Sequence, residues 1–184
     1  MIILLSGEIA SGKTTSTQIL INKFGFRKIS TSQYLIKIAE SRNLRSDRFG
    51  LQEMGDALDG ETHGEWVARL AEQQMKGREE LSWILDSIRR DFQIDHFRRM
   101  FGEKIRHIHL FAPDDFLERR FIDRRNDDCV ASIAKYFDAK KNETEIHASS
   151  LGGCADLCIN TSKFIPDDVA EIMNFSATGA RGVL

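Results

Sequence analysis

The fold of this chain is decided by residues 7–14, which read Gly7-Glu8-Ile9-Ala10-Ser11-Gly12-Lys13-Thr14. The spacing G-x-x-x-x-G-K-[ST] is that of a phosphate-binding loop, or P-loop. Its glycines allow backbone conformations that a Cβ would block, so that successive N–H groups form a concave anion site. Lys13 adds a positive charge for the β- and γ-phosphates of a nucleotide, and the Thr14 hydroxyl is a ligand for Mg²⁺.

The flanking residues predict the strand and the helix that this motif requires. Ile2-Ile3-Leu4-Leu5 is a short apolar run, typical of a buried strand. From Lys13 apolar residues recur at helical spacing until Gly25, where glycine predicts the end of the helix. The positive end of that helix also favours an anion. We therefore expect the phosphates of a nucleotide to be bound by Gly7, Glu8, Ile9, Ala10, Ser11, Gly12, Lys13, Thr14 and Thr15.

Four further apolar stretches predict strands, and helical patterns separate them. The five expected strands lie at residues 2–5, 26–29, 81–85, 105–111 and 157–159. This alternation predicts an α/β fold with a parallel sheet covered on both faces. The 184 residues are 41% hydrophobic, which is enough for one domain. We expect that domain to span residues 1–174, with residues 175–184 as a tail of no clear pattern.

Helix boundaries are predicted from capping residues. Thr31 or Ser32 is expected to cap the helix after the second strand. Pro166 to Met173 is expected to form the closing helix. The polar residues 41–50 predict a loop, and Gly50 to Gly60 a short helix. Thr62-x-x-Glu65 has the pattern of a capping box that opens the next helix.

The stretch Leu81-Ser82-Trp83-Ile84-Leu85-Asp86 predicts a hydrophobic strand that ends in a carboxylate. In a parallel sheet, Asp86 would then lie at the edge where ligands bind, where it can hold Mg²⁺. Arg89 follows at the same edge, and its guanidinium can bind a phosphate with two parallel hydrogen bonds. The alternative for Arg89 is a surface ion pair with Asp91 or Asp95.

A helix that begins near Pro113 carries four arginines in seven residues, namely Arg119, Arg120, Arg124 and Arg125. Arg120 and Arg124 are four residues apart and share a face of the helix. The arginines of such a cluster repel one another unless an anion binds to them or neighbouring acidic side chains offset their charge, and both conditions can apply here. We predict that Arg120 and Arg124 neutralise charge on a transferring phosphoryl group.

Composition and charge limit the class of protein. The net charge is −2 with both signs mixed, which argues against nucleic acid as a partner. Three cysteines and no signal peptide predict a cytoplasmic protein, and no apolar stretch approaches the length of about 20 residues of a membrane span. His107 and His109 share one face of a strand, where two histidines can in principle bind a metal, but a plain strand face is the better interpretation because no third ligand is near in sequence.

Taken together, these stretches resemble the nucleoside monophosphate kinase branch of the P-loop kinases. More narrowly, they are similar to the archaeal dephospho-CoA-kinase-like, adenylate-kinase-related group. The resemblance is carried by LLSGEIASGKTT at 4–15, WVARL at 66–70, ILDSIRRDFQIDHFRR at 84–99 and ADLCINTS at 155–162. The arginine cluster occupies the place of that group's lid arginines.

The resemblance implies a three-layer α/β/α sandwich whose five-stranded parallel sheet has the order 2-3-1-4-5, with a small helical lid at about residues 119–145. It implies ATP and Mg²⁺ on the P-loop, an acceptor phosphate held by arginines opposite, and adenine near Asn160, Thr161 and Ser162. Ser87 stands where the group has glycine, and Gln33 where many members have aspartate. The resemblance therefore leaves the acceptor open.

The sequence thus predicts an ATP-dependent kinase whose partner is a nucleotide-like small molecule, most simply a nucleoside or deoxynucleoside monophosphate. Its expected catalytic residues are Lys13, Arg89, Arg120 and Arg124, its metal ligands are Thr14 and Asp86, and Asn160 contacts ATP. One alternative is a dephospho-CoA-kinase-like hydroxyl kinase, with Glu8 or Asp86 as the base. Another is a P-loop NTPase regulatory module, which needs a mobile segment and a group that orients water.

Overall fold

The computed structural model describes residues 1–124 and 129–179. In this part of the chain five strands form one sheet in the order β2-β3-β1-β4-β5, with every neighbouring pair parallel. The strands are β1 (Ile2–Gly7), β2 (Arg27–Lys28), β3 (Trp83–Leu85), β4 (Ile105–Phe111) and β5 (Leu157–Asn160). The predicted strands and their predicted order are confirmed, and β1 lies at the centre of the sheet.

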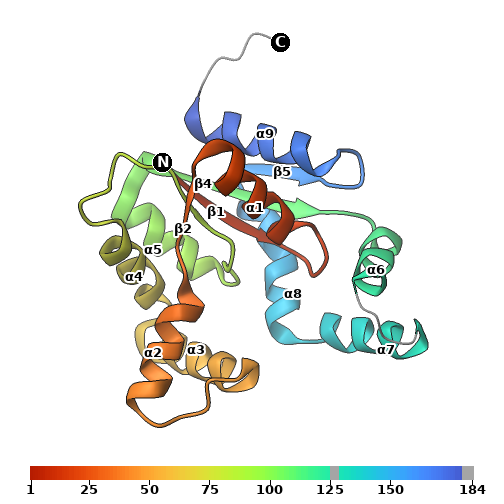
Figure 1. Ribbon diagram of the computed structural model, residues 1–184, viewed down its shortest axis with the longest axis horizontal. Helices are drawn as coiled ribbons and strands as arrows, with labels where there is room; N and C mark the ends of the chain where they lie inside the picture. Colours follow the sequence, from red (N-terminus) through yellow and green to blue (C-terminus); the bar gives the residue numbers. More distant parts are fainter. Residues whose placement is uncertain (125–128, 180–184) are drawn as a thin grey trace.

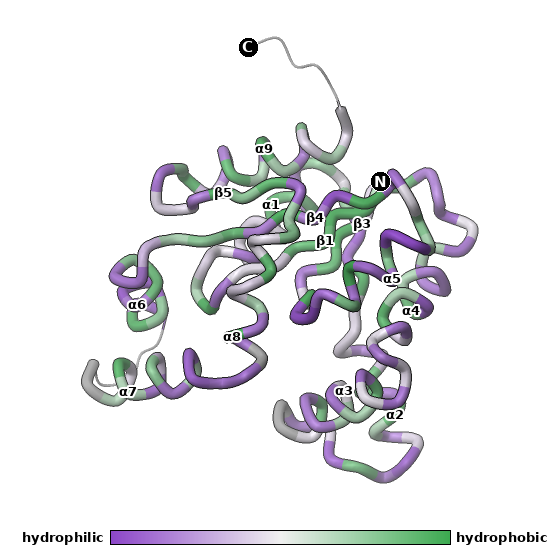
Figure 2. Tube along the Cα trace, turned by 180° about the vertical axis from the view of Figure 1, so that it is seen from behind, coloured by the Kyte–Doolittle hydropathy of each residue, from purple (hydrophilic) through white to green (hydrophobic). Residues whose placement is uncertain are grey.

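The two faces of the sheet are covered by different helices, which gives three layers (Figure 1). Alternate residues of β1 point to opposite faces. Ile3 and Leu5 pack with α1 (Lys13–Phe24) and α9 (Pro166–Thr178). Ile2 and Leu4 pack with α4 (Glu65–Met75) and α5 (Asp91–Phe101). Figure 2 shows the corresponding hydrophobic centre, with hydrophilic residues along the outer helices.

The remaining helices follow the carboxyl ends of the strands. After β2 come α2 (Thr31–Ser41) and α3 (Arg48–Thr62), and after β4 come α6 (Asp114–Asp123), α7 (Cys129–Lys140) and α8 (Glu143–Ser150). Two short 3₁₀ helices are η1 (Gly102–Lys104) and η2 (Leu151–Cys154). In Figure 1, α2 with α3 and α6 with α7 form two separate lobes beside the same edge of the sheet. The loop that follows β1 therefore lies at the sheet edge that the two helical lobes flank.

Several predicted boundaries are wrong, each because a different residue caps the helix. Ser30, rather than Thr31 or Ser32, caps α2, because its side chain accepts a hydrogen bond from the backbone of Gln33. Asp47 caps α3, so this helix already begins within the loop predicted at 41–50. The helix also runs past Gly60 to Thr62.

The predicted capping box is also wrong. Thr62 is the last residue of α3, and its hydroxyl donates back to the Leu58 carbonyl at 2.7 Å. The helix α4 instead begins after Gly64, whose φ of 76° is in the left-handed region. A side chain at that position would also meet the ring of Phe92 at 2.4 Å. This glycine therefore decides where the chain turns from α3 into α4.

The closing helix continues beyond the predicted Met173 to Thr178. Ala177 is buried on its inner side, and Gly179 ends the helix with a left-handed φ of 62°. Residues 180–184 of the predicted tail lie outside the described residues. Among the helices in the described residues, none combines the length and apolar character that crossing a bilayer would need.

Candidate active site

The loop between β1 and α1 has the backbone geometry of an anion site. Gly7 has a φ of 143°, and a Cβ there would lie 2.2 Å from the Leu110 carbonyl oxygen of β4. Gly12 has a φ of 99° and precedes the first turn of α1, whose N–H groups are free to bind an anion. Ala10, at the apex, has a left-handed φ of 62°. The backbone therefore supports the P-loop reading of residues 7–14.

The methyl group of Ala10 belongs to a small apolar cluster between the loop and the α6–α7 lobe. Ala10 packs with Leu117 and Phe121 of α6 and with Tyr136 of α7. Lys140 of α7 adds an ion pair with Glu8 of the loop at 3.6 Å and a second one with Asp114. The predicted lid region is thus attached directly to the P-loop.

The Lys13 ammonium folds back onto the loop, where it donates to the carbonyl oxygens of Gly7 at 2.6 Å and Glu8 at 2.7 Å. Burial lowers the pKa of Lys13 to about 8. The charge of Glu145 and that of Asp86 oppose this shift, whereas the cations of Arg89 and Arg124 add to it. Four charged groups from three parts of the chain therefore act on one ammonium group.

That electrostatic neighbourhood brings together several residues that the sequence singled out. Arg89 and Asp86 come from the segment after β3, and Arg124 comes from the end of α6. Glu145 comes from α8, which packs against β1. One carboxylate oxygen of Glu145 is buried and has no hydrogen-bond partner among the described residues. No sequence pattern marks Glu145, because this residue lies in a polar stretch without a motif.

Asp86 and Thr14 are suited by their chemistry to hold Mg²⁺. Both offer oxygen atoms, which are the ligands that Mg²⁺ prefers, and phosphate oxygens of a bound nucleotide complete such sites. Thr14 is exposed in the first turn of α1. Asp86 is 12% exposed and pairs with the ammonium group of Lys28 at 2.7 Å. No cluster of three or more His, Cys, Asp or Glu side chains arranged for a metal occurs among the described residues.

Arg120 contacts Thr161, the residue that follows β5. Its guanidinium donates to the Thr161 hydroxyl at 2.9 Å and to the Thr161 carbonyl at 2.8 Å. The Thr161 hydroxyl in turn donates to the Ser11 carbonyl of the P-loop at 3.1 Å. A cavity of about 190 Å³ adjoins this contact, lined by Gly12, Thr15, Ser16, Arg120, Arg124, Thr161, Phe164, Pro166 and Val169.

Asn160, which was expected to contact ATP, shapes the loop after β5. Its side-chain oxygen accepts from the Ser162 backbone at 3.0 Å and from the Ser162 hydroxyl at 2.7 Å. Thr161 lines the cavity in its place. The sequence places Thr161 in the loop expected near adenine, but it does not predict the hydrogen bonds between Thr161 and Arg120.

A second and larger cavity lies between α2, α3, α4 and the segment after β3. Its volume is about 460 Å³. Arg89 and Ser87 line it near the sheet edge, and Ser87 exchanges a 3.2 Å hydrogen bond with Thr31 at the start of α2. The site thus has two hollows, one lined by Gly12 and Thr15 of the P-loop and one lined by Arg89.

Comparison with protein families identifies the chain. A family model described as an AAA domain matches residues 7–135, starting at the first glycine of the P-loop. The chain belongs to this family. A comparison with curated protein sequences finds no match.

Three solved structures have a fold similar to that of this AAA domain. An uncharacterized protein from Eubacterium ventriosum superposes with a TM-score of 0.61 at 12% identity, covering 98% of this chain and 99% of its own. TT1252 from Thermus thermophilus does so with a TM-score of 0.61 at 18% identity, covering 99% and 98%. An unliganded sugar kinase from Janibacter sp. HTCC2649 has a TM-score of 0.53 at 14% identity, covering 98% and 95%.

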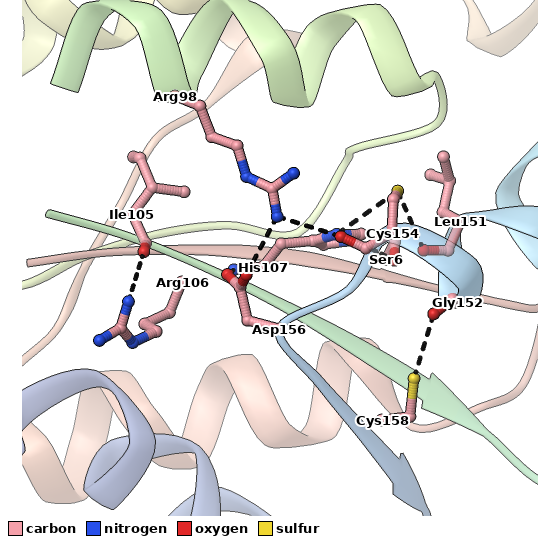
Figure 3. Close-up of polar contacts among 10 residues, drawn as sticks. All are labelled: Ser6, Arg98, Ile105, Arg106, His107, Leu151, Gly152, Cys154, Asp156 and Cys158. Atoms are coloured by element: carbon pink, nitrogen blue, oxygen red, sulfur yellow. Dashed lines mark hydrogen bonds and ion pairs between the residues drawn. The ribbon is translucent and has the colours of Figure 1, made fainter. Parts of the chain in front are cut away.

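Behind the P-loop of the AAA domain, the two histidines of β4 face a serine of β1. The Ser6 hydroxyl lies 2.7 Å from His107 Nε2 and 2.9 Å from His109 Nδ1. Burial lowers the pKa of both imidazoles, that of His109 to about 4. Figure 3 shows the network continuing to Asp156, which accepts from the His107 backbone at 2.7 Å and pairs with Arg98 at 3.0 Å. These contacts tie β1, β4 and β5 together directly below the loop.

Glu145→Gln is expected to shift the alkaline limb of the reaction to lower pH. The Glu145 carboxylate raises the pKa of Lys13, so removing its charge lowers that pKa below the value of about 8. Lys13 then loses its proton at a lower pH, and ATP capture fails earlier as the pH rises. The measurement is kcat/KM for ATP against pH, which reports the pKa values of the free enzyme. Glu143→Gln, at an exposed position on α8, is the control. If the alkaline limb is unchanged in Glu145→Gln, the Glu145 carboxylate does not set the pKa of Lys13.

Lys28→Met is expected to lower the Mg²⁺ concentration needed for half-maximal turnover. A metal ion must compete with the Lys28 ammonium for the Asp86 carboxylate. A partly exposed pair is worth up to about 1 kcal/mol, which corresponds to a shift of about fivefold. Lys23→Met removes an exposed pair with Glu171 on α1 and α9 and is the control. A higher Mg²⁺ requirement in Lys28→Met would contradict the role of Asp86.

Proposed function

We propose that this protein is an ATP-dependent kinase whose acceptor is a nucleoside or deoxynucleoside monophosphate. The observation that carries the proposal is a pair of cavities, one lined by P-loop residues and the other by Arg89, whose charge acts on the P-loop lysine. The smaller one adjoins Thr15 and Thr161, and the larger one is lined by Arg89. A kinase needs two ligand sites that approach each other at the transferring phosphoryl group. Gly12 and Thr15 of the P-loop line the smaller cavity, and Arg89 of the larger cavity acts through its charge on Lys13.

The smaller cavity suits the nucleoside part of ATP. Phe164 and Val169 give it apolar walls, and Arg120 and Arg124 offer planar cations that can stack on a base. Arg120 already uses two donors on Thr161, so in this proposal it shapes the ATP site. Arg124 acts on Lys13 and is left to neutralise phosphoryl charge.

Catalysis in this proposal consists of positioning and charge neutralisation. Lys13 leaves the Gly7 and Glu8 carbonyls to bind the phosphates, which keep it protonated. Arg89 holds the acceptor phosphate by two parallel hydrogen bonds. Thr14 and Asp86 would hold Mg²⁺, which supplies positive charge to the phosphate oxygens. A phosphate acceptor is already ionised, so it needs no general base.

A hydroxyl acceptor is the second candidate, and one observation favours it. The buried, unpartnered oxygen of Glu145 near Lys13 is a group that can accept a hydroxyl proton. Asp86 is less suited to this task, because Lys28 already holds it. Glu8 faces Lys140 of the lid. A regulatory NTPase remains the third candidate.

One assay separates the three candidates. ATP consumption is measured with purified protein and Mg²⁺, alone and with a panel of ribo- and deoxynucleoside monophosphates, nucleosides, sugars and dephospho-CoA. Turnover that requires a monophosphate supports the proposal, and turnover that requires a hydroxyl compound supports the second candidate. Turnover that ignores every acceptor and responds to a protein partner would refute both kinase readings.

A further inference from the structure

The larger cavity has chemically different ends. Near the sheet edge it is lined by Arg89 and Ser87, close enough to the P-loop for Arg89 to act on Lys13. Away from that edge it is lined by the carboxylates of Asp56 and Asp59, one helical turn apart on α3. The cavity also has an apolar wall, formed by Leu35, Leu51 and Val67. The cavity is therefore cationic toward the P-loop and carries carboxylates at its far end, where Arg90 of the lining also acts on Asp59 through its charge.

The Asp59 carboxylate is held in place by neutral donors. Its Oδ1 accepts from the Trp66 indole N–H at 2.7 Å, and the Gln93 amide donates to both oxygens at 3.2 and 3.3 Å. Trp66 and Gln93 are both buried. Within the described residues, no lysine or arginine nitrogen lies within 4.0 Å of this carboxylate. Asp59 thus keeps acceptor capacity for a ligand, chiefly on Oδ2.

Gln93 connects the two ends of the cavity. Its amide nitrogen binds Asp59, and its amide oxygen accepts from the Arg89 backbone N–H at 3.1 Å. Both polar groups of this side chain are therefore used within the protein. Gln93 acts as a positioning residue, which fixes the spacing between the phosphate-binding Arg89 and the carboxylate of Asp59.

We propose that Asp59, with Asp56 beside it, recognises the base of the acceptor, and that this base is guanine. The inference rests on the proposed function and names the acceptor within it. A carboxylate offers only acceptors, so it selects a base edge that offers adjacent donors. Guanine presents its ring N1–H and its exocyclic amino group side by side, two donors for Oδ2 of Asp59 and the carboxylate of Asp56 beside it.

The other common bases fit this carboxylate less well. Adenine and cytosine place a ring acceptor beside the amino group, and uracil and thymine place two carbonyls around one N–H. Each would set a lone pair against Asp59. An unpaired buried acceptor costs about 1–3 kcal/mol, which is one to two powers of ten in binding. The effect on kcat/KM is larger where a site is built for hydrogen bonding.

The test is phosphorylation of a nucleotide panel by the full chain, with ATP and Mg²⁺. We expect kcat/KM for GMP and dGMP to exceed that for AMP, CMP and UMP by roughly 10²-fold. IMP, which lacks the amino group, should fall between them. If the monophosphate of adenine, cytosine or uracil is phosphorylated with the same kcat/KM as GMP, the inference is overturned while the kinase proposal stands. If no monophosphate is used, the proposed function fails, and calorimetry with GMP alone still decides the inference, because absence of binding overturns it.

Asp59→Asn gives a second readout with a predicted change of preference. The amide keeps an acceptor for Trp66 but offers a donor in place of the second oxygen. GMP should lose at least tenfold in kcat/KM, whereas xanthosine monophosphate, with a carbonyl in place of the amino group, should gain relative to GMP. Glu53→Gln removes a carboxylate from the exposed side of α3, outside the cavity, and should change neither value. An unchanged GMP preference in Asp59→Asn, with a native melting temperature, would overturn the inference.

Discussion

Lys13→Ala is expected to lower kcat/KM for ATP by roughly 10³-fold, because it removes the ammonium group that stabilises phosphate charge at the loop. The fold should survive. Lys13 is only half-buried, its side chain bonds to carbonyls of its own loop, and β1 and α1 are held by Ile3, Leu5 and Leu20 in the core. The measurements are steady-state kinetics and thermal unfolding of the same preparation.

Lys23→Ala is the matched control for this variant. Lys23 lies in the last turn of the same helix, is exposed and pairs with Asp167 and Glu171 of α9. Its loss should leave phosphoryl transfer within about twofold of the native rate. Native activity in Lys13→Ala would remove the basis of the proposed site.

Arg89→Ala is expected to have the second largest effect, a loss of roughly 10²–10³-fold in kcat/KM for the acceptor. Arg89 lines the larger cavity and its charge acts on Lys13, so it can touch both ligands at the point of transfer. KM for ATP should change far less than KM for the acceptor. Arg89→Lys should recover only part of the loss, since an ammonium group cannot form the two parallel hydrogen bonds.

Arg69→Ala is the control for charge and size. Arg69 is exposed on α4 and pairs with Glu65 one turn earlier, at 3.0 Å, outside both cavities. Its replacement should alter neither KM. Equal losses for ATP and acceptor in Arg89→Ala would contradict its assignment to the acceptor cavity.

The sheet was predictable because each strand is a local signal. Apolar runs such as Ile2-Ile3-Leu4-Leu5 alternate with helical patterns, and this alternation has few structural solutions. The loop was predictable because its glycines and Lys13 stand at fixed spacing. Strand order came from the resemblance, since no residue pattern encodes which strands are neighbours.

The rest of the site depends on contacts between distant residues, which no local pattern shows. Glu145 approaches Lys13 only because α8 packs against β1, and the helix around it has no apolar periodicity that marks it. Asp59 is one of several acids on α3, and only Trp66 and Gln93 distinguish it from them. The wrong capping box shows the same limit, because Gly64 could turn the chain where Thr62 had the better local sequence.

Ala10 gives the α6–α7 lobe a direct influence on how nucleotide leaves. Its left-handed φ of 62° costs an alanine about 1–2 kcal/mol, and the ring of Tyr136 and the side chains of Leu117 and Phe121 hold its methyl group in that conformation. Withdrawal of the two helices would free the apex of the loop to relax and would flatten the concave row of amides. In the proposed kinase, departure of the lobe would then be coupled to release of the phosphates, and the packing of Tyr136 beside Ala10 would influence the rate of product escape.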